Sequence, residues 1–123
     1  KKLAILGLTY KAGTDDLRSS PAIDLIHLLQ KEGASISAYD PEGMNNTDKY
    51  FTNLDCAESI YAAAKNSDAI IIVTEWTEFQ KMDLNKIKTL VKTPNIIDLR
   101  NLFKPEEITS LGFKYYSIGR KSG

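Results

Sequence analysis

The stretch Ala69-Ile70-Ile71-Ile72-Val73 decides the fold class of this 123-residue chain. It is continuous, rich in β-branched side chains and too short for most helices, which is typical of a central parallel strand covered on both faces. Working outward from this stretch, we expect four further short strands. They are Leu3–Leu8, Ser35–Tyr39, Asn95–Asp98 and Lys114–Ile118.

Helix signals stand between the expected strands. Ser20 followed by Pro21 provides an N-cap and a proline at the first helical position. Asp55, with Glu58 three residues later, resembles a capping box and predicts a second helix beginning there. Asp83 caps a third helix, and a short fourth helix opens near residue 105. Strands and helices therefore alternate with connections of crossover length, which predicts an α/β fold with a five-stranded parallel sheet and helices on both faces.

Composition and charge exclude several classes of protein. The 16 basic residues balance 16 acidic ones, so a nucleic-acid partner held by phosphate neutralisation is not expected. The 42% of hydrophobic residues is too high for a disordered chain, and one cysteine cannot form an internal disulfide. No apolar run approaches the roughly 20 residues that span a bilayer, so we expect no membrane partner. We expect residues 1–120 to form a single domain and residues 121–123 to be a frayed tail.

Polar, cationic and aromatic side chains follow the carboxyl ends of the expected strands, where open parallel sheets bind ligands. Four cations at these positions can surround an anion: Lys11, Arg18, Arg100 and Arg120. Arginine suits phosphate because its planar fork donates two parallel hydrogen bonds. Charged residues also populate loops in general, so spacing alone leaves both a phosphate site and an ordinary solvated edge open.

Other chemistries find little support in the residues. Gly7 and Asp40 resemble parts of a dinucleotide fingerprint, but the remaining glycines of G-x-G-x-x-G are missing, so we expect no autonomous NAD site. Cys56 follows the expected cap Asp55, where a helix N-terminus would favour a thiolate, yet a lone cysteine is more often a structural thiol. The only histidine, His27, lies in a helix and is expected to pack there. We expect no catalytic residue and no metal site in this chain.

Five motifs in sequence order resemble those of the nucleotide-sugar dehydrogenases. The first, Gly7–Pro21, matches the G-[LF]-x-[FY]-K-x-x-T-D-D-x-R-x-[SA]-P signature that opens their C-terminal, UDP-binding domain. The others are Tyr39–Met44, Thr74–Trp76, Asp98–Asn101 and Tyr116–Arg120. The resemblance covers essentially the whole chain and is closest to the bacterial UDP-glucose 6-dehydrogenases. It implies a three-layer, Rossmann-like domain.

The resemblance also implies a function and site residues. Such enzymes oxidise the C6 alcohol of the sugar to a carboxylate and reduce two NAD, which an N-terminal domain binds. Tyr10, Lys11 and Arg100 match positions that contact the UDP-sugar, and Arg18 matches an arginine that reaches toward NAD. Glu75 and Trp76 match recurrent positions and are expected to shape the loop after the third strand. The nucleophilic cysteine of the family belongs to the N-terminal domain, so Cys56 does not inherit that role.

The chain is therefore expected to be one part of a longer enzyme and to be inactive alone. Its expected partners are a UDP-sugar and the N-terminal NAD domain of the same enzyme, within a cytoplasmic homodimer. Two alternatives stay open. The same domain occurs in UDP-N-acetyl-hexosamine and GDP-mannose dehydrogenases, and a stand-alone nucleotide-binding α/β module would share its architecture.

Overall fold

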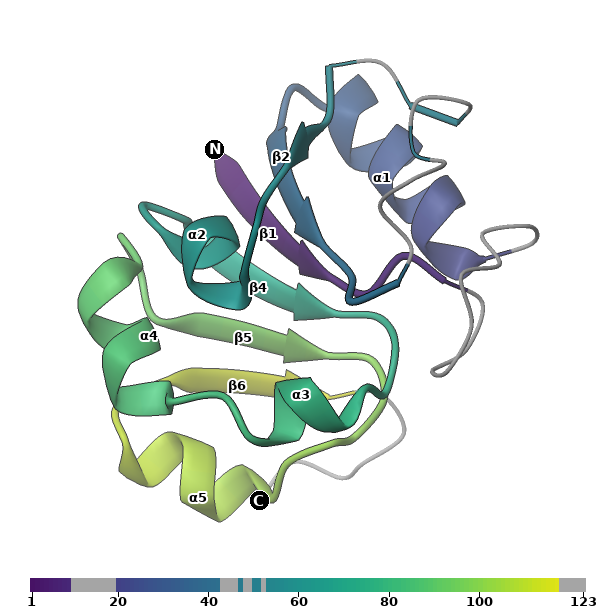
Figure 1. The fold of residues 1–123 in the computed structure, drawn as a ribbon. Helices are drawn as coiled ribbons and strands as arrows, with labels where there is room; N and C mark the ends of the chain where they lie inside the picture. Colours follow the sequence, from purple (N-terminus) through teal and green to yellow (C-terminus); the bar gives the residue numbers. More distant parts are fainter. Residues whose placement is uncertain (10–19, 43–46, 48–49, 52, 118–123) are drawn as a thin grey trace.

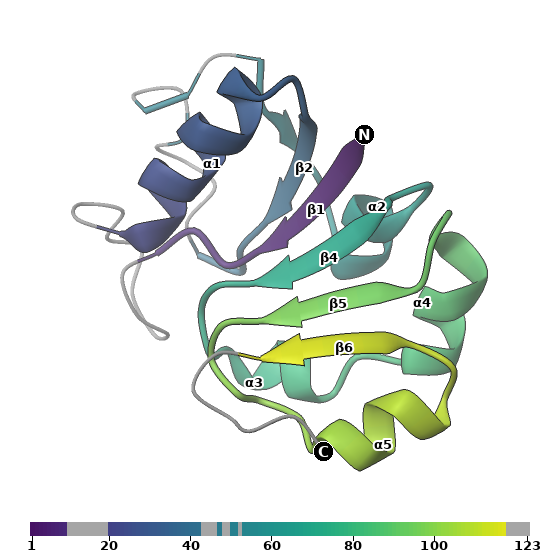
Figure 2. The same cartoon turned by 180° about the vertical axis from the view of Figure 1, so that it is seen from behind.

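Six parallel strands form one sheet in the order β3-β2-β1-β4-β5-β6 (Figures 1 and 2). The structure is a computed structural model that describes residues 1–9, 20–42, 47, 50–51 and 53–117. The strands are β1 (Lys2–Leu6), β2 (Ser35–Tyr39), β3 (Asp55–Cys56), β4 (Ala69–Ile72), β5 (Asn95–Asp98) and β6 (Lys114–Ser117). The expected tail, residues 121–123, lies outside the described residues.

The β4 strand lies at the centre of the sheet, as its sequence predicts. All four of its residues are buried, and it pairs with β1 on one side and β5 on the other. Ile71 faces Ile5 in one neighbour and Ile97 in the other. Continuous β-branched side chains suit this position because a central parallel strand has no solvated face.

Helices cover the two faces of the sheet unequally. The helices are α1 (Pro21–Lys31), α2 (Ile60–Ala64), α3 (Thr77–Gln80), α4 (Leu84–Leu90) and α5 (Pro105–Ser110). Among them, α1 packs Ala22 and Ile26 against the face that carries Ile5 and Ile71. The other four helices pack on the opposite face, and Figure 2 shows α2, α3 and α4 behind the sheet and α5 beside β6. None of the helices in the described part of the chain is long and apolar enough to cross a membrane.

The prediction of five strands was wrong by one, and the error lies at residues 55–58. Asp55 and Cys56 form the edge strand β3, and the helix after it begins at Ile60 with Ser59 as its N-cap. The Ser59 hydroxyl accepts a hydrogen bond from Ala62 N at 3.0 Å. Strand pairing with the open edge of β2 therefore prevails over the local capping-box pattern, and Cys56 is not at a helix N-terminus.

The other two predicted helix caps are confirmed. Ser20 accepts a hydrogen bond from Ala22 N at 3.2 Å, and Asp83 accepts one from Lys86 N at 3.2 Å. The helix α3, which has four residues and no side-chain cap, was not predicted. Its signal is a single buried aromatic residue, Phe79, which is too little for a helical pattern.

Candidate functional site

The carboxyl ends of β1, β2, β4 and β5 lie side by side at one edge of the sheet, where the arrowheads end in Figure 1. We call this the strand-end edge and define it by the described residues that follow these strands. They are Leu8, Thr9, Asp40, Thr74, Glu75, Trp76 and Arg100. Of the residues predicted to contact a ligand, Arg100 is therefore at the expected edge. Tyr10, Lys11, Arg18 and Arg120 lie outside the described residues.

Asp40 organises the first half of the strand-end edge. Its side chain is 1% exposed, and its Oδ2 accepts hydrogen bonds from Leu8 N at 2.7 Å and Thr9 N at 3.1 Å. The same oxygen accepts one from the indole of Trp76 at 3.3 Å, and Oδ1 accepts one from Glu42 N at 2.9 Å. A buried carboxylate needs such donors because burial without them is costly. Asp40 thereby holds the backbone that leads directly into Tyr10 and Lys11.

This geometry explains why Asp40 is no ribose-binding acid. A carboxylate that binds a ribose hydroxyl must face the ligand, whereas this one faces backbone amides inside the protein. In this structure Asp40 therefore serves as an anchor for the backbone of residues 8 and 9. The sequence signal for the observed role is Asp40-Pro41-Glu42 directly after a strand, which is typical of a side chain that bonds the backbone two residues later.

The β1 and β4 ends approach each other closely at Gly7 and Thr74. Gly7 has a positive φ of 102°, and a Cβ built there would lie 2.6 Å from the backbone nitrogen and side chain of Thr74. The Thr74 hydroxyl donates a hydrogen bond to the Thr9 carbonyl at 3.0 Å. Only glycine allows this approach, so the backbone of residues 7–9 is held from both the β2 and the β4 side.

Asp98 organises the second half of the strand-end edge in the same way. This fully buried residue ends β5, and its Oδ1 accepts a hydrogen bond from Arg100 N at 3.0 Å. Its Oδ2 accepts hydrogen bonds from Leu102 N at 2.7 Å, Phe103 N at 3.2 Å and the Tyr115 hydroxyl at 2.6 Å. The loop that carries Arg100 is therefore anchored on a carboxylate beneath it.

The two halves of the strand-end edge meet through an ion pair between Glu75 and Arg100. The Nε of Arg100 contacts Oε2 of Glu75, and both side chains are partly exposed, at 43% and 38%. Glu75 was expected to shape its loop, and Arg100 was not predicted as its partner. No local signal could reveal the pair, since the two residues follow different strands.

Tyr39, the last residue of β2, is tied to α3 by its hydroxyl. That hydroxyl donates to the Glu78 carboxylate, at 2.8 Å from Oε2 and 3.1 Å from Oε1. Burial, the hydrogen bond to Glu78 and the nearby charges of Glu78 and Asp40 raise the pKa of Tyr39 to about 12. Folding therefore favours the protonated phenol.

We expect the stability contributed by Tyr39 to depend on alkaline pH. Its ordinary pKa is 10.0 and its folded-state pKa is about 12. The contribution is therefore complete below about pH 10 and is lost as the pH rises through about 12. Urea denaturation of the wild type and of Tyr39→Phe should give a stability difference that shrinks over this interval. Glu78→Gln lowers the folded-state pKa of Tyr39, so the loss should be smaller and complete at a lower pH. A difference independent of pH would contradict the prediction.

Cys56 and His27, the only cysteine and histidine of the sequence, make the following contacts. Cys56 is exposed on the edge strand β3, with its sulfur 3.3 Å from the Thr47 hydroxyl. His27 lies on α1, where Nε2 is 2.6 Å from the Tyr50 carbonyl and the ring packs edge-on against Phe51. Within the described ranges, no three His, Cys, Asp or Glu side chains gather as a metal site would require.

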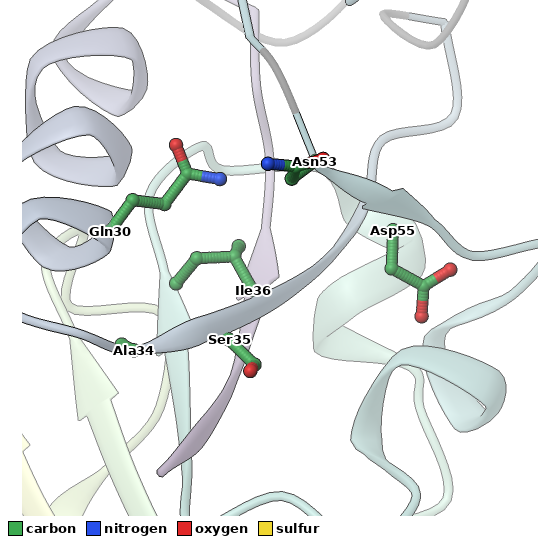
Figure 3. A pocket seen from close by; sticks show the side chains of 6 residues that line it. All are labelled: Gln30, Ala34, Ser35, Ile36, Asn53 and Asp55. Atoms are coloured by element: carbon green, nitrogen blue, oxygen red, sulfur yellow. The ribbon is translucent and has the colours of Figure 1, made fainter.

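A hollow of about 330 Å³ lies at the opposite end of β2 from the strand-end edge. It is lined by Gln30, Ala34, Ser35, Ile36, Asn53 and Asp55. Figure 3 shows the Gln30 side chain reaching from α1 toward Asn53, above Ile36. The Asp55 carboxylate instead accepts a hydrogen bond from Ser37 at 3.2 Å. None of these lining side chains is cationic, so the hollow is poorly suited to bind a phosphate. The strand-end edge, which carries Arg100, suits a phosphate better.

Comparison with known proteins gives consistent matches. Residues 4–105 match the model of the UDP-glucose/GDP-mannose dehydrogenase family, UDP binding domain. The chain is 50% identical to a UDP-glucose 6-dehydrogenase of Rhizobium meliloti, over 97% of this chain and 27% of that relative. It is 54% identical to one of Rickettsia bellii, over 98% of this chain and 28% of that relative. The chain thus spans about a quarter of these relatives.

A solved structure supports the same fold. The NDP-N-acetyl-D-galactosaminuronic acid dehydrogenase of Methanosarcina mazei superposes with a TM-score of 0.86 at 28% identity. The superposition covers 98% of this chain and 25% of that protein. A Rossmann-like α/β domain with a parallel sheet is thereby confirmed, with six strands in place of five.

Proposed function

Since the chain belongs to the UDP-glucose/GDP-mannose dehydrogenase family and forms its UDP-binding domain, we propose that it binds the nucleotide sugar for an NAD-dependent UDP-glucose 6-dehydrogenase. The parent enzyme would convert UDP-glucose and two NAD to UDP-glucuronate. Two relatives at 50% and 54% identity carry the UDP-glucose 6-dehydrogenase name, which supports this substrate over the N-acetyl-hexosamine and GDP-mannose alternatives.

The observation that carries the proposal is the position of Arg100. Its loop is anchored on Asp98, and its side chain is 43% exposed at the strand-end edge, where a ligand can reach it. A guanidinium there can donate two parallel hydrogen bonds to a diphosphate. Tyr10 and Lys11 continue the backbone that Asp40 holds at the neighbouring strand end, and we propose that they contact the same UDP moiety.

The chain supplies binding and orientation, and the reacting groups belong elsewhere in the parent enzyme. Binding energy from the non-reacting diphosphate can position the sugar for oxidation. From the family resemblance we propose that NAD is bound mainly by the N-terminal domain, with Arg18 reaching toward it. From the family resemblance we also propose that the parent enzyme is a cytoplasmic homodimer. We propose that this chain alone has no dehydrogenase activity.

Titration of the isotope-labelled chain with UDP tests the site. We expect amide shifts at Arg100 and Leu102, and Arg100→Ala should weaken UDP binding by about thirtyfold, because a charged hydrogen bond contributes about 2 kcal/mol. Lys104→Ala is the matched control, since this exposed cation follows the same strand. A parallel titration with GDP tests whether the site prefers uracil to guanine. Shifts absent at millimolar UDP, or equal effects of the two variants, would contradict the proposed site.

A further inference from the structure

The tripeptide Thr74-Glu75-Trp76 connects three neighbouring strand ends. Thr74 donates its hydroxyl to the Thr9 carbonyl beyond β1 at 3.0 Å, and Trp76 donates its indole N–H to Asp40 beyond β2 at 3.3 Å. Glu75, between them, turns to the other side and pairs with Arg100 beyond β5. We propose that Glu75 is a positioning residue for nucleotide binding: it holds the Nε edge of Arg100 so that the Nη1–Nη2 edge meets the diphosphate. This inference rests on the proposed function of Arg100.

Hydrogen bonds hold the residues on both sides of Glu75, which restricts the positions that its carboxylate can reach. Thr74 is 2% exposed, and the Thr74 carbonyl accepts a hydrogen bond from Trp76 N at 3.1 Å. The Trp76 side chain packs partly against the core beneath α3 and α4. With both neighbours held, Glu75 has little freedom besides its own side-chain torsions.

The backbone of Arg100 is fixed as well, which leaves its side chain as the variable part. Arg100 N donates to Asp98, and Leu99 N donates to the Ile72 carbonyl of β4 at 3.0 Å. An exposed arginine side chain has many rotamers, and holding it in one orientation for a ligand costs rotamer entropy. A partner that selects one orientation before the ligand arrives reduces that cost.

The atom that Glu75 contacts matters for the chemistry. Arginine has five N–H donors: one on Nε and two on each Nη. Glu75 meets the Nε side as an ion-pair partner, and within the described part of the chain no other ionic partner meets the guanidinium. The Nη1–Nη2 edge can therefore still donate in parallel to a phosphate. Pairing at Nε thus orients Arg100 without occupying its outer edge.

Orientation and charge have opposite effects on UDP, so the two must be separated. The Glu75 carboxylate repels phosphate, whereas its oxygen orients Arg100. Glu75→Gln keeps an acceptor for Nε and removes the charge, and Glu75→Ala removes both. If Glu75 positions Arg100, Glu75→Ala weakens UDP binding about tenfold and Glu75→Gln restores the affinity to within about threefold of wild type. Glu106→Ala, an exposed glutamate of α5, is the matched control and should leave the affinity unchanged.

The Arg100 Nε–H resonance provides a readout that needs no nucleotide. We expect it to be protected from solvent exchange in the wild type and in Glu75→Gln, and to lose protection in Glu75→Ala. Tighter UDP binding in both Glu75 variants would show that Glu75 competes with phosphate, and unchanged binding in Glu75→Ala would show that it does not position Arg100. Either result overturns the inference while wild-type UDP binding upholds the proposed function. Failure of the wild type to bind UDP overturns the proposed function, and the role of Glu75 with it.

Discussion

Replacing Asp98 by asparagine is expected to lower the free energy of unfolding by about 3 kcal/mol, because a buried carboxylate that accepts from several donors cannot be matched by an amide. The asparagine amide can adopt two orientations. One places its NH2 against Arg100 N, and the other places it against the backbone amides of Leu102 and Phe103. The remaining hydrogen bonds would lose the strength that the charge provides. The loop that presents Arg100 should loosen, so UDP affinity should fall as well.

Urea denaturation measures the free energy of unfolding that Asp98→Asn loses. Two further variants serve as comparisons. Asp24→Asn makes the same chemical change at an exposed position of α1 and should cost well under 1 kcal/mol. Tyr115→Phe removes one donor to Asp98 and should cost about 1 kcal/mol. If Asp98→Asn unfolds at the same urea concentration as Asp24→Asn, the buried carboxylate does not anchor the loop.

Replacing Gly7 by alanine should be equally damaging, for a steric reason. The new Cβ would lie 2.6 Å from Thr74 N, and a buried backbone atom just after β4 cannot swing away. Alanine would also be strained at a φ of 102°. Backbone strain of about 1 kcal/mol and overpacking of about 2 kcal/mol predict a total loss of about 3 kcal/mol.

Gly33→Ala separates the contribution of backbone strain from that of overpacking. Gly33 also has a positive φ, of 92°, but a Cβ there meets nothing within 4 Å. This variant should lose only the strain, about 1 kcal/mol. The difference between the two variants in thermal or urea unfolding reports the close approach of β1 and β4. Equal losses would mean that Thr74 imposes no constraint on residue 7.

Local patterns predicted the elements that depend on local physics. The central strand β4 is a continuous β-branched run, and β2 and β5 begin and end at the predicted residues. The caps Ser20 and Asp83 are confirmed because a cap bonds amides only two or three residues away. The candidate edge also follows from the sequence, since parallel strands bring their carboxyl ends together.

The error at Asp55 shows where local patterns fail. Asp55 and Glu58 have capping-box spacing, yet Asp55 pairs with Ser37 of β2 in a two-residue strand. Nothing in the sequence Asp55-Cys56 is typical of a strand; its partner makes it one. Ser59, four residues on, then provides the helix cap.

The sequence by itself determined the fold class, the order of the main elements and the family, and it predicted the edge at which we propose that a nucleotide binds. Apolar periodicity, caps and motifs are properties of neighbouring residues, so they can be read without coordinates. Only the tertiary structure decided that Asp40 holds the backbone of Leu8 and Thr9 and that Glu75 meets Arg100. Such pairs join loops from different strands, and which charge faces which follows from strand order and burial, which no local pattern encodes.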